Sequence, residues 1–121
     1  MFYIENEKTD NEIVIKINGN ATIQNIEKIN ENFNENLSFN KIIIDLRNIT
    51  EVDFSFVQIL VLFYSYCLSN KLLLVIKDDY FPQNLNNLVI QLGFDRLQLK
   101  NENLIYSLKD FFKINRMAIN E

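Results

Sequence analysis

The sequence predicts a single α/β domain whose central sheet is mostly parallel or mixed, with four to five strands and about four helices. Short runs of β-branched residues alternate with longer stretches in which apolar residues recur every three or four positions. Two of the strand segments are apolar throughout, which is typical of parallel strands covered on both faces. The 121 residues contain no linker or repeat, so we expect one domain over residues 1–121 with the order β-β-α-β-α-β-α-(β)-α.

The first half of the chain predicts two strands and one helix. Residues 2–6 (FYIEN) and 12–18 (EIVIKIN) are the strands, and the isoleucines of the second alternate so that all three share one face. Gly19 and Asn20 are expected to end this strand. Residues 22–37 predict an amphipathic helix with Thr22 as its N-cap. The helical face that includes its apolar residues comprises Ile23, Ile26, Ile29 or Asn30, Phe33 and Leu37.

The second half of the chain continues the alternation of strands and helices. Residues 41–46 (KIIIDL) and 71–77 (KLLLVIK) are the two fully apolar strands, and residues 55–69 between them predict a long helix. Pro82 is expected to open a further helix, which Gly93 ends in the left-handed conformation. Residues 96–100 predict a short last strand, and residues 103–117 predict a final amphipathic helix.

The composition excludes several classes of function. Histidine is absent and Cys67 is the one cysteine, so neither a Cys/His zinc site nor a His-dependent catalytic triad can form. Two glycines leave no phosphate-binding loop or dinucleotide fingerprint, and we expect no cofactor. The net charge of −4, with scattered basic residues, argues against nucleic acid. Asp78 and Asp79 are the remaining catalytic candidates, but a solvated turn explains them, and we expect no enzyme.

The chain is expected to work in the cytoplasm. Its first ten residues lack the basic and apolar regions of an export signal. The longest apolar run, residues 54–68, has about 15 positions, whereas a spanning helix needs roughly 20. Direct membrane insertion is therefore not expected. The lone cysteine in this run fits a buried side chain in a reducing compartment.

The predicted helix over residues 55–69 has an outer face without charge. One narrow stripe contains Ser55, Gln58, Leu62, Ser65 and Ser69. The opposite, core-facing set contains Phe56, Leu60, Phe63, Tyr64 and Cys67. A helix coated only by solvent carries Lys and Glu on its outer face, so this face predicts a protein partner. Alternatively, the C-terminal segment 101–121 covers it, and self-association through the same helix, giving a homodimer, is compatible with either.

Asp53 and Ser55 stand where this helix begins, and they allow two interpretations. The spacing S-x-x-Q predicts a capping box in which the Ser55 hydroxyl accepts the backbone N–H of Gln58, or Asp53 caps the helix instead. Because a helix N-terminus also favours anions, a phosphate on Ser55 is compatible with the fold. It would add nearly two negative charges to an uncharged face. Ser55 is therefore a cap or a phosphorylation candidate.

Three segments together resemble the STAS domain, the fold of bacterial anti-sigma factor antagonists. These segments are INGNATIQNIEKI, KIIIDLRNITEVDFSFVQILVLFYSYCLSNKLLLVI and LVIQLGFDRL, and the resemblance covers residues 10–98. It implies that Asp53 matches the aspartate of the family motif and Ser55 the serine that a partner kinase phosphorylates. Phe54 stands where the family has Ser or Thr. Phe56 replaces a glycine and places a bulky ring where a kinase approaches the backbone.

The resemblance implies a regulator that binds an anti-sigma factor or serine kinase-like partner. Gln58 and the ATI segment are more similar to a second branch, the small STAS proteins that dock onto the ATPase of lipid-transporting ABC systems or onto chemotaxis-type partners. In either branch the same loop and helix provide the binding surface. The residues expected to bind the partner are Asp53, Phe54, Ser55, Gln58, Leu62, Ser65 and Tyr66.

Overall fold

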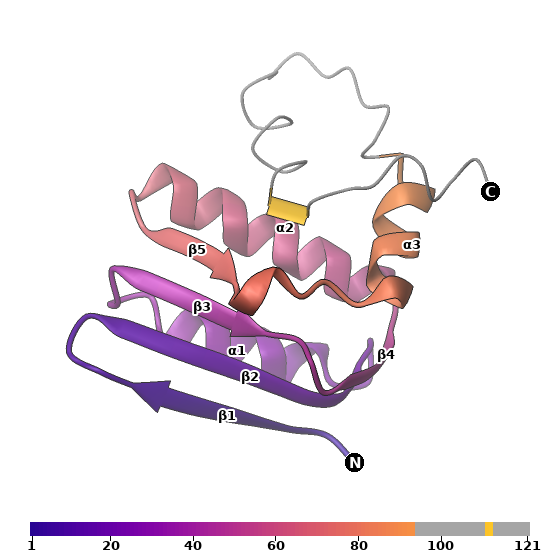
Figure 1. The fold of residues 1–121 in the computed structure, drawn as a ribbon, viewed down its shortest axis with the longest axis horizontal. Helices are drawn as coiled ribbons and strands as arrows, with labels where there is room; N and C mark the ends of the chain where they lie inside the picture. The colour runs from indigo at the N-terminus through magenta and orange to yellow at the C-terminus, as the bar shows by residue number, and fades with distance from the viewer. Residues whose placement is uncertain (94–110, 113–121) are drawn as a thin grey trace.

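The computed structural model describes residues 1–93, 111 and 112, which form one mixed sheet with helices packed on it (Figure 1). The elements in chain order are β1 (Tyr3–Lys8), β2 (Glu12–Ala21), α1 (Ile26–Glu35), β3 (Lys41–Asp45), β4 (Ile49–Val52), α2 (Phe54–Ser69), β5 (Leu73–Ile76), the 3-10 turn η1 (Lys77–Asp79) and α3 (Gln83–Gln91). The α/β class expected from the sequence is confirmed. The strand expected over 96–100 and most of the helix expected over 103–117 lie outside the described residues.

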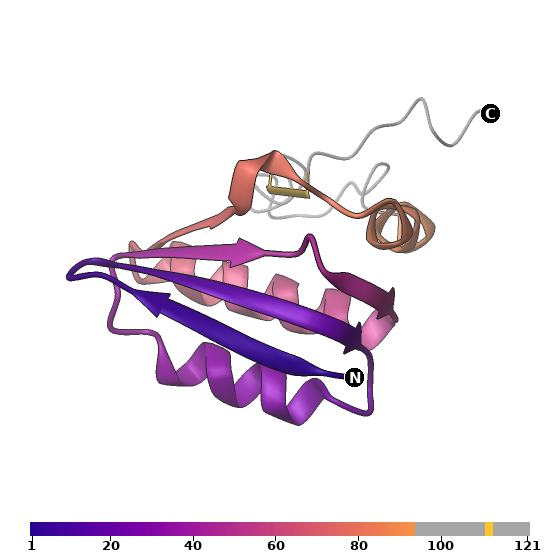
Figure 2. The same ribbon diagram turned by 60° about the horizontal axis from the view of Figure 1, so that its bottom comes forward.

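The sheet has five strands, four of them in the order β1-β2-β3-β5. β1 runs antiparallel to β2, while β3 is parallel to both β2 and β5. β4 is parallel to the last residues of β2, with a β-bulge in this pairing between Gly19 and Asn20. The helices α1 and α2 cover one face of the sheet, and α3 lies at the end where β2 and β4 finish (Figure 2). This topology brings the start of α2 close to the turn that precedes α1.

The hydrophobic core lies between the sheet and the helices α1 and α2. The three isoleucines of β2 alternate onto this face as predicted, and all three are fully buried. Ile42 and Ile44 of β3 pair beside them and are equally buried. Phe33 of α1 stacks on Phe63 of α2 with ring centroids 4.4 Å apart, which fixes the two helices against each other. Cys67 is buried here as predicted, and burial raises the pKa of its thiol to about 11.

The opposite face of the sheet is only half-buried. Val14, Ile43 and Val75 line up across β2, β3 and β5 on this face, and Leu73 is 53% exposed. Glu12, Lys16 and Lys41 lie on the same face by alternation, and both lysines form ion pairs, at 3.7 Å to Glu7 and to Glu12. The prediction that the two apolar strands are covered on both faces is therefore wrong. An apolar run does not reveal that neighbouring strands bring charged residues to one of its faces.

Gly19 does not end β2, contrary to the sequence prediction. The strand continues to Ala21, and Gly19 adopts a positive φ of 92° at the bulge. A Cβ atom at this position would lie 1.8 Å from the carbonyl oxygen of Met1. The glycine is therefore required by the close passage of the N-terminus. The residues beyond the bulge pair with β4, a four-residue strand that was missed in the sequence because it has neither length nor clear alternation.

The first helix begins three residues later than predicted. Its N-cap is Asn25 rather than Thr22, because the N–H of Asn25 donates to the carbonyl of Thr22 at 2.9 Å in a separate turn. Ile23, expected on the core face, lies in this turn and is 66% exposed. The third helix follows the prediction more closely, since Pro82 precedes it and Gly93 follows it with φ 83°.

A buried carboxylate joins the ends of β3 and β5. Asp45 is 1% exposed and accepts two hydrogen bonds from the Arg47 guanidinium, at 3.1 and 2.9 Å, while the Lys77 ammonium lies 3.8 Å away. Burial acts to raise the pKa of Asp45, but these hydrogen bonds and charges outweigh it, and the pKa lies below its ordinary value. Asp78, one of the two aspartates considered for catalysis, lies in η1 and pairs with Arg47 at 3.8 Å. The Arg47 guanidinium therefore lies near both carboxylates, those of Asp45 and Asp78.

Candidate partner-binding site

The Asp53 carboxylate connects two segments that are distant in sequence. The residue has an extended backbone between β4 and α2, and its Oδ1 accepts the N–H of Ser55 at 3.1 Å. Its Oδ2 accepts the N–H of Ile23 at 2.8 Å. One side chain therefore caps α2 and fixes the turn before α1 beside the first turn of that helix.

Ser55 lies inside the first turn of α2 and is not its cap. Its hydroxyl donates a hydrogen bond to Oδ1 of Asp53, and the helix already begins at Phe54. The capping box of Ser55 with Gln58 is therefore wrong, and the alternative, in which Asp53 caps the helix, is confirmed. Gln58 is exposed, and the structure shows no hydrogen bond from its side chain to another described residue.

Asp53 is ionised at neutral pH. Burial acts to raise the pKa of its carboxyl, but hydrogen bonds from the Ser55 hydroxyl and from the backbones of Ile23, Phe56 and Ser55 outweigh this effect. The pKa of Asp53 therefore lies below its ordinary value. The beginning of α2 thus carries a fixed negative charge in contact with a serine hydroxyl.

The two phenylalanines on either side of Ser55 point to different environments. Phe56 is fully buried in the core, whereas Phe54 is 47% exposed. The expectation that the Phe56 ring obstructs the backbone at the surface is therefore wrong, because the ring packs inward. Phe54 instead adds apolar surface directly beside Ser55, which is half-buried.

The outer face of α2 exposes large apolar side chains. Leu62 is 66% exposed, and Tyr66 and Leu68 are each 47% exposed. Ser65, which precedes Tyr66, is half-buried. No residue of this 16-residue helix is charged. Four of the five residues predicted to face the core are buried, and Tyr64 is half-buried against Phe111, with ring centroids 4.5 Å apart. The helix therefore has the two faces predicted from the sequence.

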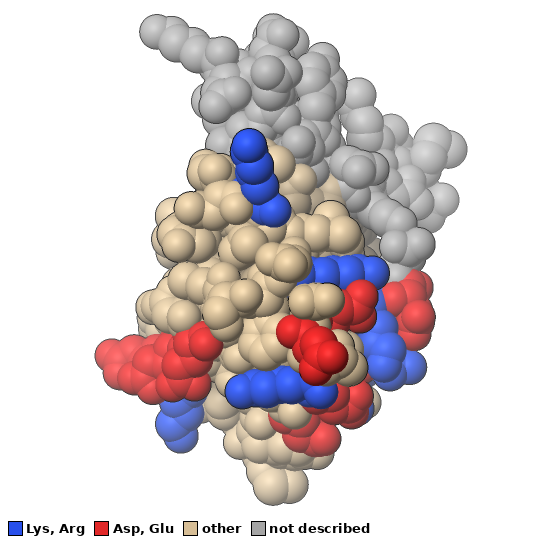
Figure 3. Space-filling model, turned by 90° about the vertical axis from the view of Figure 1, so that its left-hand side faces the viewer, with Lys and Arg blue, Asp and Glu red and all other residues tan. Residues whose placement is uncertain are grey.

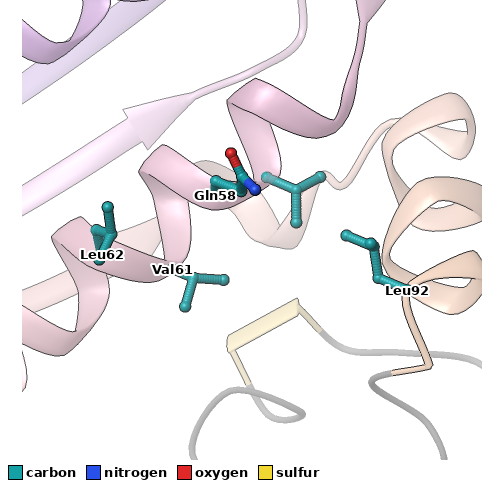
Figure 4. A pocket seen from close by; sticks show the side chains of 5 residues that line it. Gln58, Val61, Leu62 and Leu92 are labelled. Carbon is teal, nitrogen blue, oxygen red and sulfur yellow. The ribbon is translucent and has the colours of Figure 1, made fainter.

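Two hollows border this exposed face. One, of about 440 Å³, lies between α2 and α3 and is lined by Val57, Gln58, Val61, Leu62 and Leu92. Leu92 extends from the end of α3 toward α2, and Val61 points into the same space (Figure 4). The other, of about 190 Å³, lies between α1 and α2 and includes Asn30, Asn34 and Leu37. Leu62 lines both hollows and forms the ridge between them.

Ile23 is a surface residue that sequence reasoning missed. Its N–H is held by Asp53, so its exposed side chain lies near the start of α2, where Phe54 is also exposed. No local signal separates it from the helical pattern of residues 22–37, because its N–H donates to a residue thirty positions away. We call Ile23, Phe54, Gln58, Leu62 and Tyr66 the α2 surface.

None of the helices among the described residues is long and apolar enough to cross a membrane. Within the same part of the chain, no three His, Cys, Asp or Glu side chains converge in a way that could hold a metal ion.

A family model described as "Mlab, STAS domain" matches residues 4–104. No curated protein matches the chain by sequence. Solved structures resemble it at low identity. An anti-sigma factor antagonist from Mycobacterium paratuberculosis is 14% identical, with a TM-score of 0.64 over 90% of this chain and 95% of its own. The antagonist SpoIIAA of Bacillus, in its unphosphorylated form, is 17% identical, with a TM-score of 0.59 over 90% of this chain and 98% of its own.

Two further structures show how widely this fold occurs. A sulfate transporter family protein from Wolinella succinogenes is 15% identical, with a TM-score of 0.57 over 73% of this chain and 71% of its own. Mglu is 8% identical with a TM-score of 0.57, and the match spans 20% of its length. At these identities the likeness establishes the fold.

Proposed function

The chain belongs to the STAS domain family, and from this premise we propose that it is a non-enzymatic regulatory domain that binds a protein partner. The binding site comprises the Asp53 loop and the outer face of α2. The observation that carries this proposal is the exposure of Phe54, Leu62 and Tyr66 on a helix without charge. A grouped apolar surface of this kind is typical of protein–protein contact. We place the domain in the cytoplasm.

The site residues divide by role. Asp53 shapes the loop and caps the helix, so it positions the surface. Phe54, Leu62 and Tyr66 supply apolar contact area, and aromatic side chains are the usual anchors of such interfaces. Gln58, Ser65 and Ser55 provide polar groups within the same face. The proposed partner is an anti-sigma factor or a serine kinase-like protein, as in the antagonist branch of the family.

Phosphorylation of Ser55 is the proposed means of ending this contact. A phosphate there would lie against the ionised Asp53 carboxylate, which accepts the Ser55 hydroxyl hydrogen bond. Repulsion between these anions would displace one of them, and nearly two negative charges would enter an uncharged face. The burial of Phe56 leaves the approach to Ser55 free of that ring. SpoIIAA, whose fold is similar, has been solved in a phosphorylated form.

A second candidate function is an accessory subunit that docks onto the ATPase of a lipid-transporting ABC system or onto a chemotaxis-type partner. The description of the matching family, "Mlab, STAS domain", favours it, as does Phe54 in place of the Ser or Thr of the antagonist motif. The same α2 surface would bind in this case, without any need for phosphorylation. The identity of the bound protein separates the two candidates.

The decisive experiment is a pull-down from the native host with four baits: the unmodified chain, Ser55→Asp, Ser55→Ala and Thr9→Asp. Thr9 lies exposed after β1, so Thr9→Asp adds the same charge away from the site. We expect a partner that is retained by the unmodified chain, Ser55→Ala and Thr9→Asp and lost by Ser55→Asp. Equal retention by all four baits contradicts the switch. A retained transporter ATPase in place of a kinase-like protein identifies the second candidate.

A further inference from the structure

The hollow of about 190 Å³ between α1 and α2, here called the groove, follows one face of α2. On the α2 side it is lined by Ile59, Leu62, Phe63 and Tyr66, which recur at the i, i+3, i+4 and i+7 positions of one helical face. Residues at this spacing form the ridges between which a third helix packs. The Leu62 and Tyr66 side chains that border the groove are 66% and 47% exposed.

The α1 side of the groove carries an acidic rim. Asn30 and Asn34 line the groove itself. At about 100° per residue, Glu27 and Glu31 come next around α1, on the side away from the core. Both glutamates are exposed, and no described residue forms an ion pair with either of them. Lys28 is also exposed but lies farther around α1, so Glu27 and Glu31 are the charges of this helix nearest to the groove.

Four basic residues elsewhere in the described part of the chain form ion pairs. Lys16, Lys41, Arg47 and Lys77 each pair with a carboxylate, and all of them lie on strands or immediately after them. Figure 3 shows acidic and basic side chains mixed at the end of the molecule that lies at the left of Figure 1, with a largely uncharged area above them that has a basic side chain at its top. Glu27 and Glu31 beside the groove form no such pair, and neither do the exposed Glu5, Asp10, Glu35 and Glu51 in the same part of the chain.

We infer that this groove binds one amphipathic helix of a partner protein whose flank carries Lys or Arg residues. The inference rests on the proposed function and specifies the partner segment that the α2 surface takes. The apolar residues of that helix recur every three or four positions and contact Leu62 and Tyr66. Its basic flank faces Glu27 and Glu31. Recognition of this kind combines a helix in a hydrophobic groove with charge complementarity at the rim.

The test is a selection from a displayed library of random peptides about 18 residues long, roughly five helical turns. The baits are the full chain, the double variant Glu27→Lys/Glu31→Lys, the single variant Leu62→Glu, and the control Glu5→Lys/Asp10→Lys. Glu5 and Asp10 are exposed at the β1 end of the sheet, so the control makes the same change in net charge away from the groove. Circular dichroism on each bait checks that all four chains are folded.

We expect the unmodified chain to enrich peptides that combine an apolar stripe of helical period with Lys or Arg on one flank. The best such peptide should bind Glu27→Lys/Glu31→Lys about tenfold more weakly, because two attractive contacts become repulsive. The control variant should bind it unchanged, and added salt should weaken binding to the unmodified chain. Enrichment of peptides without basic residues, equal binding to the rim variant, or no enrichment at all overturns the inference.

The same variants separate this inference from the proposed function. If the native partner is lost with Leu62→Glu but retained by Glu27→Lys/Glu31→Lys, the α2 surface binds a protein, but the inference that the bound segment is a basic helix is wrong. If the native partner is retained by both variants, the proposed function fails as well. A concentration-dependent increase in the mass of the pure chain that Leu62→Glu abolishes would assign the groove to a second copy and also overturn the inference.

Discussion

The backbone N–H of Ile23 donates a 2.8 Å hydrogen bond to the Asp53 carboxylate, although the two residues are thirty positions apart in the chain. The same carboxylate accepts the N–H and the hydroxyl of Ser55. The turn before α1 and the first turn of α2 are therefore held by one side chain. As a result, the exposed side chains of Ile23 and Phe54 are positioned together.

Replacing Asp53 should destabilise this junction. Asp53→Ala removes the cap of α2 and leaves the N–H groups of Ile23 and Ser55 without their acceptor, so we expect the free energy of unfolding to fall by about 1–2 kcal/mol. Asp53→Asn retains one side-chain acceptor and should cost less, because asparagine is itself a good N-cap. Denaturant unfolding measures both changes. An alanine variant as stable as the unmodified chain would show that the junction does not depend on this carboxylate.

Acid should weaken the contacts of the Asp45 carboxylate that join the ends of β3 and β5. Because the pKa of Asp45 is lower in the folded chain than its ordinary value of 3.8, its contribution to stability is fully present above that ordinary value. The contribution is lost as the pH falls through the folded pKa. We therefore expect stability to decline below about pH 4, and the decline to be smaller in Asp45→Asn.

At neutral pH the Asp45→Asn variant should be less stable by about 1–3 kcal/mol, since a buried acceptor of charged hydrogen bonds is replaced by an amide. Thermal unfolding at pH 7 and at pH 3 measures both effects. Glu5→Gln, which removes an exposed carboxylate on β1, is the matched control and should follow the unmodified chain at both values. A pH dependence that Asp45→Asn leaves unaltered would assign the acid sensitivity to other carboxylates, including Asp53.

Much of the fold was predictable because its strongest signals are local. The alternating isoleucines of β2, the long apolar helix and the glycine after α3 each depend on the residues beside them in sequence, and the structure confirms all three. The exposure of Leu62 and Tyr66 also follows from helical geometry alone. The choice of Asp53 as the cap was one of two alternatives that the sequence left open.

The missed features depend on contacts between distant residues. Ile23 continues the helical pattern in sequence, yet it lies in a turn before the helix and its N–H donates to Asp53. β4 is defined by its pairing with the end of β2, about thirty positions earlier in the chain. The half-buried face of the sheet likewise depends on a neighbouring strand, which places charged residues near Ile43. No window of the sequence contains both partners of any of these contacts.

Gly19→Ala should cost more stability than Gly93→Ala. Both glycines have positive φ, 92° and 83°, so alanine introduces similar backbone strain at each, of about 1–2 kcal/mol. A Cβ at Gly19 would also lie 1.8 Å from the Met1 carbonyl oxygen, whereas a Cβ at Gly93 meets nothing within 4 Å. The difference between the two melting temperatures therefore reports the displacement of the N-terminus. Equal melting temperatures would show that the N-terminus can move aside without loss of stability.

The last prediction separates stability from partner binding along a single helix. Leu60 and Leu62 are two positions apart in α2, but Leu60 is fully buried and Leu62 is 66% exposed. Leu60→Ala should therefore lower the free energy of unfolding by about 2–5 kcal/mol, whereas Leu62→Ala should change it by no more than about 0.5 kcal/mol. Denaturant unfolding gives these values, and pull-down of the native partner gives the second readout. If the α2 surface binds that partner, the Leu62→Ala chain should fail to retain the partner although its own stability is unchanged. The Leu62 side chain contributes contact area to the partner and little packing to the core. A Leu62→Ala chain that unfolds as readily as Leu60→Ala would mean that the residue serves the core, and the partner-binding role of this face would be contradicted.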